Sequence, residues 1–252
     1  SALACDLDDD FGAQTKVEFD MDGLEACAKS WPHDPKNFTT EAAAGDLEAL
    51  REALGAPQLN LLGGSYGTRL ALVYARLYES HVRTMVLDGV APPTMALPSS
   101  FAEDGQAALD RLFDDCRDAS GCAVQFPDLR SLFSEALRQN GQQQAPVTFV
   151  HPRTGEAIEV PLTETVFASG VRGLLYSPGL SALLPMIIAA AAEGDFVPFL
   201  NALVALGDPP EPMMDLGLML SVLCAEDLPR IDPAAYEERW NQTFLKSSMY
   251  DL

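Results

Sequence analysis

The residues with the clearest chemical meaning are Gly63-Gly64-Ser65-Tyr66-Gly67, which form a Gly-x-Ser-x-Gly motif. An apolar run over residues 59–62 precedes the motif, and a run with helical character over residues 70–78 follows it. A serine on a tight turn between a strand and a helix exposes its hydroxyl for nucleophilic attack. The bare pattern also arises by chance, but the flanking strand and helix favour the catalytic interpretation. We therefore predict that Ser65 is the nucleophile of an acyl-transfer reaction.

The other residues of the motif fit the same interpretation. Side chains at Gly63 and Gly67 are expected to collide with the neighbouring turn, which would explain the two glycines. The N–H of Tyr66 begins the predicted helix and points to where the oxyanion of a tetrahedral intermediate forms. Tyr66 is therefore the predicted backbone donor to the oxyanion.

A serine nucleophile also needs a base and an acid that orients the base. The chain has three histidines, His33, His81 and His151. His33 lies in a proline-rich loop, His81 follows the helix after the motif, and His151 lies in a predicted extended pair, so none is expected to be the base. Asp88 ends the next predicted strand and is expected to be structural rather than the catalytic acid.

Composition and charge exclude several classes of function. Asp and Glu outnumber Lys and Arg by 37 to 16, and the formal net charge is −21, so phosphate backbones would be repelled and nucleic-acid binding is not expected. No uninterrupted apolar run is long enough to cross a bilayer, so no membrane span is predicted. Without a Cys-x-x-Cys pair, and with so few histidines, neither a metal site nor a cofactor is predicted.

The spacing of the cysteines suggests disulfides. Cys116 and Cys122 are close enough in sequence for a small local loop, and Cys5 and Cys27 bracket one short segment. Two such disulfides would leave Cys224 without a partner and would suit an oxidising compartment, so the protein is expected to be periplasmic or secreted. The alternative is that these cysteines are buried free thiols.

Hydrophobic periodicity predicts an α/β fold. Residues 1–38 are acidic and irregular, with one short extended piece at 17–19. A helix capped by Thr39 or Thr40 and ended by Gly55, a strand, the helix after Ser65 and a second strand at 83–87 form a βαβ unit with a parallel sheet. After residue 93 the pattern becomes mostly helical, with helices predicted at 101–115, 128–139, 164–174, 180–193 and 196–206 and an extended pair at 147–150 and 157–160.

Several segments resemble the α/β-hydrolase fold, and more narrowly the branch that contains proline iminopeptidases and tripeptidyl aminopeptidases. The likeness rests on Phe38-Thr39-Thr40, on the motif continued through Thr68-Arg69, and on Val86-Leu87-Asp88-Gly89-Val90-Ala91-Pro92. The later segment, with the Cys116/Cys122 pair and residues 221–227, resembles the lid of that branch more loosely. The resemblance implies part of a hydrolase core at 1–93, a helical lid at 94–235 and a tail at 236–252 that leads back towards the core.

The departures from the family pattern are also informative. The family places its nucleophile after the fifth strand, an oxyanion loop upstream, and the acid and histidine downstream of the lid. None of these parts is found in the sequence, so we expect an incomplete sheet and a chain that lacks the catalytic acid and histidine. Missing N- and C-terminal segments of the same hydrolase are the expected partners.

The resemblance implies a function for the parent protein. Enzymes with this lid use acidic side chains to hold the α-ammonium group of a substrate, which makes Glu226 and Asp227 candidates for that role, against a solvated helix end. The expected activity is that of a serine hydrolase cleaving short peptides from the free N-terminus through Ser65. The alternatives are a carboxylesterase of the same fold, acting on an ester, and a catalytically incomplete fragment that serves as a binding or assembly piece.

Overall fold

The computed structural model describes residues 3, 21–142, 146–207 and 215–246, and these residues form two compact units. Within the described residues, the first unit holds residues 3, 21–99 and 215–232. The second unit holds residues 100–142, 146–207 and 233–246. The sequence predicts a boundary between core and lid at residues 93 and 94. The first unit extends further, to Ser99, and it also contains residues 215–232, which lie in the predicted lid range.

The first unit contains the predicted βαβ arrangement and an additional helix near its start. Its elements are α2 (Met21–Ser30), η1 (Pro35–Asn37), α3 (Thr40–Ala53), β1 (Leu59–Gly64), α4 (Tyr66–Leu77), η2 (Glu79–His81), β2 (Val82–Asp88), α12 (Leu216–Val222), the π-helix η3 (Leu223–Asp227) and η4 (Leu228–Arg230). Helix α2 corrects the expectation that residues 1–38 are irregular. The extended piece expected at 17–19 lies outside the described residues.

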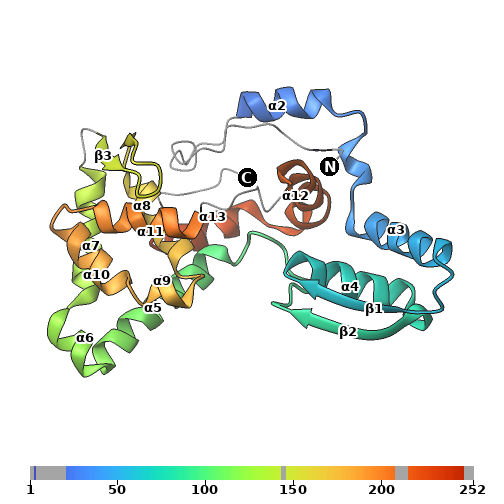
Figure 1. Cartoon of the computed structure of the whole chain (residues 1–252), viewed down its shortest axis with the longest axis horizontal. Coiled ribbons are helices and arrows are strands. Elements are labelled where there is room, and N and C mark those ends of the chain that lie inside the picture. The colour runs from blue at the N-terminus through green and yellow to red at the C-terminus, as the bar shows by residue number, and fades with distance from the viewer. Residues whose placement is uncertain (1–2, 4–20, 143–145, 208–214, 247–252) are drawn as a thin grey trace. The chain divides into compact units, whose positions relative to one another are not determined.

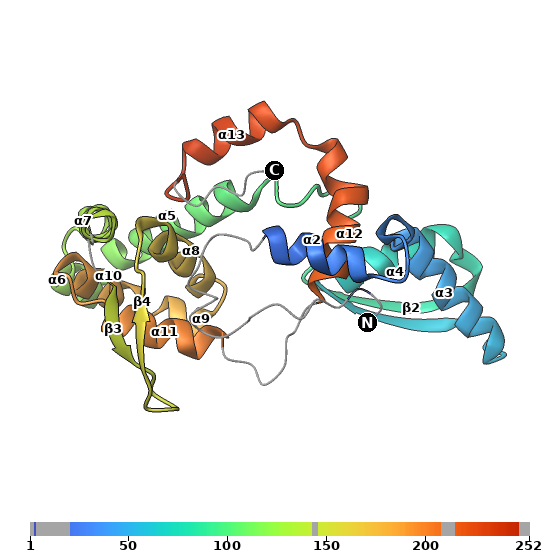
Figure 2. The same ribbon diagram turned by 90° about the horizontal axis from the view of Figure 1, so that it is seen from above.

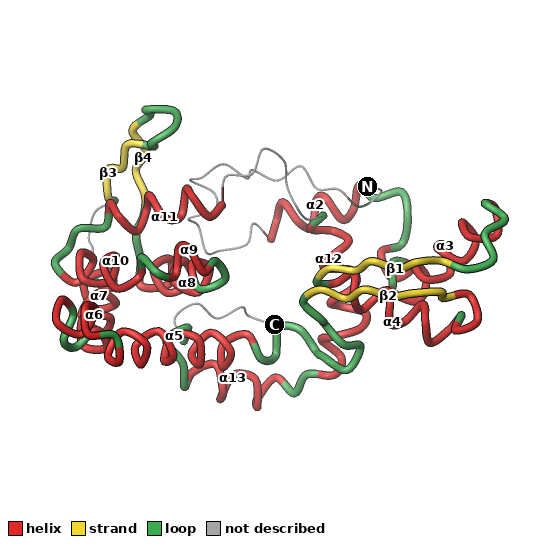
Figure 3. The backbone as a smooth tube through the Cα atoms, turned by 60° about the horizontal axis from the view of Figure 1, so that its bottom comes forward, coloured by secondary structure: helices red, strands yellow, loops and turns green. Residues whose placement is uncertain are grey.

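Strands β1 and β2 pair in parallel, as the sequence predicted (Figures 1 and 3). The pairing runs from Leu59 opposite Val82 to Gly64 opposite Asp88, with an irregularity after Leu59. One face of the pair packs on α3 and α4, where Ala44, Val73 and Tyr74 form the centre of a hydrophobic core.

The other face of the sheet carries exposed apolar side chains. Leu62 and Val86 are paired across the two strands, and they are 82% and 59% exposed. Parallel sheets in α/β proteins normally have both faces covered, so this sheet is incomplete in the described part of the chain.

The second unit is mostly helical. It consists of α5 (Phe101–Asp118), α6 (Ser120–Gln125), α7 (Leu129–Gly141), β3 (Val147–Val150), β4 (Ala157–Val160), α8 (Glu164–Leu174), α9 (Pro178–Ser181), α10 (Leu184–Ala192), α11 (Val197–Gly207) and α13 (Pro233–Asn241). Strands β3 and β4 form the expected antiparallel hairpin. The aromatic rings of Phe113, Phe167 and Phe244 surround Phe133 in its core. Residues 242–246 therefore pack within this unit.

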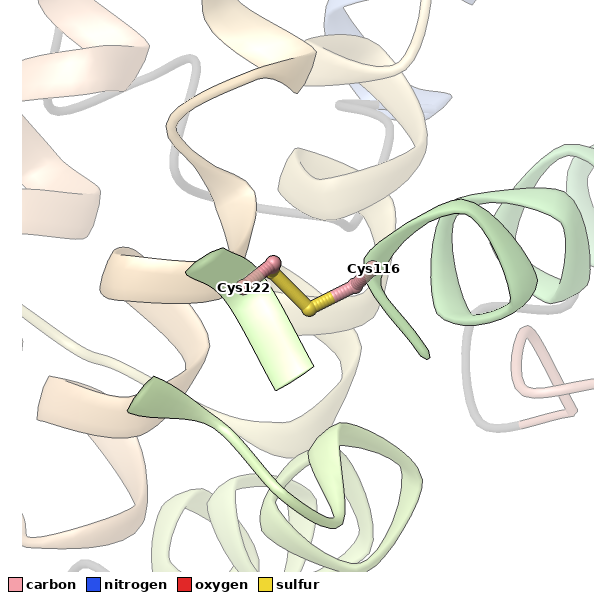
Figure 4. The surroundings of a disulfide bond; sticks show 2 residues. All are labelled: Cys116 and Cys122. Atoms are coloured by element: carbon pink, nitrogen blue, oxygen red, sulfur yellow. A yellow bond between two sulfur atoms is a disulfide. The ribbon is translucent and has the colours of Figure 1, made fainter. Parts of the chain in front are cut away.

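A disulfide joins Cys116 near the end of α5 to Cys122 in α6, with a Cα–Cα distance of 5.0 Å (Figure 4). This pairing is the one predicted from the sequence. Cys27 is also a disulfide cysteine, whereas its predicted partner Cys5 lies outside the described residues. Cys224 is free and exposed.

No helix in the described residues is both long and apolar enough to cross a membrane.

A polar cluster around the buried Glu48 joins α3 and α4 to η2. Two nitrogens of Arg51 donate to the two oxygens of Glu48 at 3.0 and 2.7 Å, and the Tyr74 hydroxyl donates to Glu48 at 2.8 Å. Nδ1 of His81 lies 2.9 Å from the same carboxylate. The hydrogen bonds from Arg51, and the weaker effects of Tyr74 and His81, outweigh burial and lower the pKa of Glu48 from 4.5 to about 2. Burial and Glu48 together raise the pKa of Tyr74 to about 12.

We predict that Glu48 makes the first unit sensitive to acid. Because the folded-state pKa is depressed, the stabilisation is present above pH 4.5 and is lost as the pH falls from about 4.5 to about 2. The variant Glu48→Gln should be less stable than the unaltered chain near neutral pH, and the difference should shrink in acid. Urea unfolding followed at Trp31 in a Trp240→Phe background reports on the first unit, because Trp31 packs beside Gly217 of α12.

The control for this prediction is Glu25→Gln, because Glu25 pairs with Lys29 on the surface, where their side chains are 65% and 72% exposed. Exposed pairs contribute little, so this variant should track the unaltered chain at every pH. A difference between Glu48→Gln and the unaltered chain that stays constant from pH 6 to about pH 2 would contradict the assignment.

Candidate active site

Ser65 is the single residue between strand β1 and helix α4, and its backbone is strained. Its φ of 49° and ψ of −120° make it the only non-glycine residue with positive φ among the described residues. Such a conformation costs about 1–3 kcal/mol and persists only where the surroundings enforce it. Here the Ser65 N–H donates to the carbonyl of Asp88 at 3.0 Å, and the N–H and hydroxyl of Thr68 both donate to the Ser65 carbonyl. Ser65 is exposed.

Close packing at Gly63 enforces this turn. A Cβ at Gly63 would lie 2.4 Å from the carbonyl oxygen of Gly67 and 2.8 Å from the nitrogen of Thr68, so only glycine fits. The expected collision at Gly67 is wrong, because a Cβ there would meet nothing within 4 Å. Gly67 lies inside α4 with its carbonyl towards Gly63. The steric restriction to glycine therefore applies to Gly63, on the strand side of the turn, and not to Gly67.

Tyr66 contributes a backbone donor and a side chain that connects the turn to helix α3. Its N–H is the first of α4 and has no acceptor within the helix, so it is free to meet a developing negative charge. Its hydroxyl lies 3.0 Å from the hydroxyl oxygen of Thr40, the first residue of α3. Partial burial raises the pKa of Tyr66, so the hydroxyl stays protonated at neutral pH.

The carboxylate of Glu226 lies at the other side of Thr40. The Thr40 N–H donates to one oxygen of Glu226 at 2.5 Å, and the Thr40 hydroxyl donates to the other at 2.8 Å. The side chain of Glu226 remains 23% exposed. Thr40, at the start of α3, therefore orients the partly exposed carboxylate of Glu226 and also contacts the hydroxyl of Tyr66.

Asp227, the second acidic candidate, is in a different environment. It is fully buried, and Nη1 of Arg69 contacts its two oxygens at 2.9 and 3.0 Å. Nη2 of Arg230 donates to one of these oxygens at 2.6 Å. Two arginines thus occupy the carboxylate of Asp227, which exposes no atom that an ammonium group could reach. Figure 2 shows α12, which leads into this segment, beside α4, the helix that carries Arg69.

None of the three histidines bonds to Ser65 in the structure. His81 ends η2, directly before β2, whereas Ser65 follows the end of β1, so the length of the strands, about 20 Å, separates them. His33 is exposed and contacts the ring of Phe38. His151 is buried in the second unit, where its Nδ1 accepts from the N–H groups of Arg153 and Thr154.

The other acidic candidates add no further site. Asp88 is exposed, and it is its backbone carbonyl that holds Ser65. Among the described residues, no group of three or more His, Cys, Asp or Glu is placed to bind a metal ion.

Sequence reasoning missed the contributions of Thr40 and Arg69. Thr40 was expected only as a possible cap, and it is Thr39 that caps α3 by accepting from the Ala42 N–H. Arg69 lies four residues after Ser65 and four before the buried Val73, on the inner face of α4. A charged residue in such an apolar stripe signals a buried ion pair, but its partner is 158 residues away in sequence.

The comparison with protein families covers the part of the chain that contains Ser65. The model of the alpha/beta hydrolase fold matches residues 24–132. This segment is therefore similar to the alpha/beta hydrolase fold family. It contains Ser65 and the parallel strand pair.

The chain is similar over part of its length to several bacterial peptidases. Tripeptidyl aminopeptidase of Streptomyces lividans is 43% identical over 84 residues, which cover 32% of this chain and 15% of that protein. Serine protease Hip1 of Mycobacterium tuberculosis is 38% identical over 96 residues, which cover 35% of this chain and 18% of that protein. Proline iminopeptidase of Xylella fastidiosa is 33% identical over 130 residues, 50% of this chain and 40% of its own. The matched region is thus less than half of each relative.

The contrast between the two glycines before Ser65 gives a prediction for the stability of the first unit. Gly63→Ala forces a Cβ against backbone atoms at 2.4 Å and should destabilise the first unit by about 1–3 kcal/mol or more. Gly64→Ala is the matched control, because a Cβ there meets nothing within 4 Å, and its effect should stay within about 1 kcal/mol. Urea unfolding of both variants measures the difference, and equal losses of stability would refute the packing argument.

The strain at Ser65 gives a second prediction. Glycine adopts positive φ without a steric cost, whereas alanine keeps the strain, so Ser65→Gly should be more stable than Ser65→Ala. The larger entropy of glycine in the unfolded chain opposes this gain, which leaves a net difference of about 1 kcal/mol. Equilibrium unfolding of the two variants measures it. Ser65→Ala being the more stable of the two would mean that the turn is relaxed.

Proposed function

We propose that the protein is a serine hydrolase that cleaves short peptides from their free N-terminus by acyl transfer through Ser65. The observation that carries this proposal is the exposed, strained Ser65 directly before the first N–H of α4. The similarity of part of the chain to peptidases supports the choice of substrate.

In the proposed reaction, Oγ of Ser65 forms a bond to the carbonyl carbon of the substrate while its proton passes to a base. The carbonyl oxygen becomes an oxyanion, which the Tyr66 N–H stabilises by a hydrogen bond. The C–N bond then breaks, and the departing amine takes up the proton. Water hydrolyses the resulting ester, and Ser65 recovers its proton.

The base, the orienting acid and a second oxyanion donor have to come from elsewhere, since no histidine of the chain bonds to Ser65. We propose that they lie in polypeptide beyond these 252 residues, either in further parts of the same hydrolase or in a separate chain. The exposed sheet face at Leu62 and Val86 is compatible with additional strands and helices of such a core.

For the free N-terminus we propose Glu226 as the amine anchor. Its carboxylate is already oriented by Thr40 and is partly exposed, so binding an ammonium group requires little reorganisation. The side chain of Tyr66 and two hydrogen bonds connect this carboxylate to the backbone beside Ser65. We propose that a short extended peptide whose carbonyl lies at Ser65 spans the distance to Glu226. Asp227, which has no exposed atom, is not included in this role.

Two other functions remain in view. A carboxylesterase would use the same nucleophile and would not need Glu226. A binding or assembly piece is the second candidate, and the observation that favours it is the lack of a histidine bonded to Ser65. For the location of the protein, the Cys116–Cys122 disulfide supports a periplasmic or secreted site, since such bonds persist in oxidising compartments.

The proposal predicts very low turnover by the 252 residues alone. Loss of a triad commonly reduces kcat by several powers of ten, so hydrolysis of both an alanyl-alanyl-alanyl-coumarin amide and p-nitrophenyl acetate should be feeble. Added imidazole is a small diffusible base and should accelerate ester turnover by the unaltered chain above the rate of imidazole in solution. In Ser65→Ala this acceleration should vanish.

Three results would change the proposal. Robust turnover without imidazole that is lost in Ser65→Ala would show that His33, His81 or His151 acts as the base. An absence of any Ser65-dependent response to imidazole would favour the binding or assembly piece. Ester turnover by a form of the protein that contains the missing base, without peptide turnover, would identify a carboxylesterase.

A further inference from the structure

Arg69 is a buried charge that the proposed reaction does not use. It lies one helical turn after Ser65 in α4 and is 2% exposed. Its Nη1 contacts both oxygens of Asp227, and its Nη2 donates to the carbonyl of Met95 at 2.8 Å. Removing a guanidinium from water is costly, so these contacts are needed to hold it there.

Arg230 binds the same partners from the other side. Its Nη2 donates to Asp227 at 2.6 Å and to the Met95 carbonyl at 2.8 Å, and its Nη1 donates to the carbonyl of Pro93 at 3.0 Å. Its Nε donates to the backbone carbonyl of Glu226 at 2.7 Å. The two arginines thus fix Asp227 and, through the backbone, the adjacent Glu226.

The distances also show how charge is divided between the two neighbouring carboxylates. Nη1 of Arg69 lies 2.9 Å from Asp227 but 3.8 Å from Oε2 of Glu226, which is beyond a hydrogen bond. Glu226 receives its hydrogen bonds from the neutral donors of Thr40 instead. Asp227 therefore takes the hydrogen bonds of Arg69, which makes only a longer ion pair with Glu226.

We propose that Asp227 and Arg69 are positioning residues that hold Glu226 in place and keep its carboxylate free for the ammonium group of a substrate. This inference rests on the proposed function of Glu226. Loss of the Asp227 charge releases Arg69, which can then pair with Glu226 and compete with the ammonium group. Simultaneous loss of Arg69 removes the competitor, so the double variant regains part of what Asp227→Asn loses.

The test compares binding of trialanine with binding of N-acetyl-trialanine to the 252-residue chain by isothermal titration calorimetry. The ratio of the two dissociation constants measures the preference for a free amine. A charge-assisted contact implies a preference of about tenfold or more in the unaltered chain. Glu226→Gln should abolish it. Asp227→Asn should reduce it at least about threefold, and Arg69→Met/Asp227→Asn should recover part of the loss, a non-additive result.

Glu48→Gln is the matched control, because it also alters a buried carboxylate bonded to an arginine in the same unit, away from Glu226. It should lower the melting temperature, as Asp227→Asn does, without changing the amine preference. This separates positioning from a general loss of stability, since a merely structural role for Asp227 would give the two variants the same preference.

The outcomes distinguish the inference from the function on which it rests. If Glu226→Gln abolishes the preference and Asp227→Asn leaves it intact, the positioning role is wrong and the amine anchor stands. If the double variant binds no more selectively than Asp227→Asn, competition by Arg69 is wrong. If the unaltered chain shows no preference, or Glu226→Gln retains it, both the anchor and the positioning role are overturned.

Discussion

The geometry of the first unit depends on one contact, the approach of Gly63 to the carbonyl of Gly67. This approach allows strand β1 to pass into helix α4 through a single residue, and it requires the strained backbone at Ser65. The pairing with β2 stabilises the same turn, since the last residue of β2 accepts from the Ser65 N–H. The exposed hydroxyl is thus a result of backbone packing, and no side-chain contact of the serine is needed to present it.

Two arginine–carboxylate pairs contact helix α4, one near each end. Arg69 meets Asp227 in its first turns, and towards its other end Tyr74 donates to Glu48, which Arg51 also binds. Such pairs add little net stability compared with apolar packing, but they fix geometry because a displaced partner leaves a buried charge unpaired. One pair joins α4 to the segment that carries Glu226, and the other joins it to α3. Helix α4 therefore fixes the position of Ser65 relative to the carboxylate of Glu226.

Local pattern was sufficient to predict much of the fold. The Gly-x-Ser-x-Gly motif, its flanking strand and helix, and the hairpin of β3 and β4 were all visible as short-range signals in the sequence. Helix α2 was missed although Met21, Leu24 and Ala28 recur at helical spacing, because the segment was grouped with the acidic residues before it. The environment of Asp227 was out of reach for a different reason. Its burial depends on Arg69, and no local pattern specifies a pairing across 158 positions.

The bare sheet face at Leu62 and Val86 has a practical meaning for anyone who handles the isolated chain. Two paired strands leave an outer edge on each side, and the N–H and C=O groups along those edges are templates for other strands. Combined with apolar side chains that are 82% and 59% exposed, such edges promote self-association. The formal charge of −21 opposes this through repulsion between copies, and salt weakens the repulsion. Whether copies of the isolated chain associate thus depends on the balance between attraction at the strand edges and repulsion between surface charges, and a higher ionic strength shifts this balance towards association.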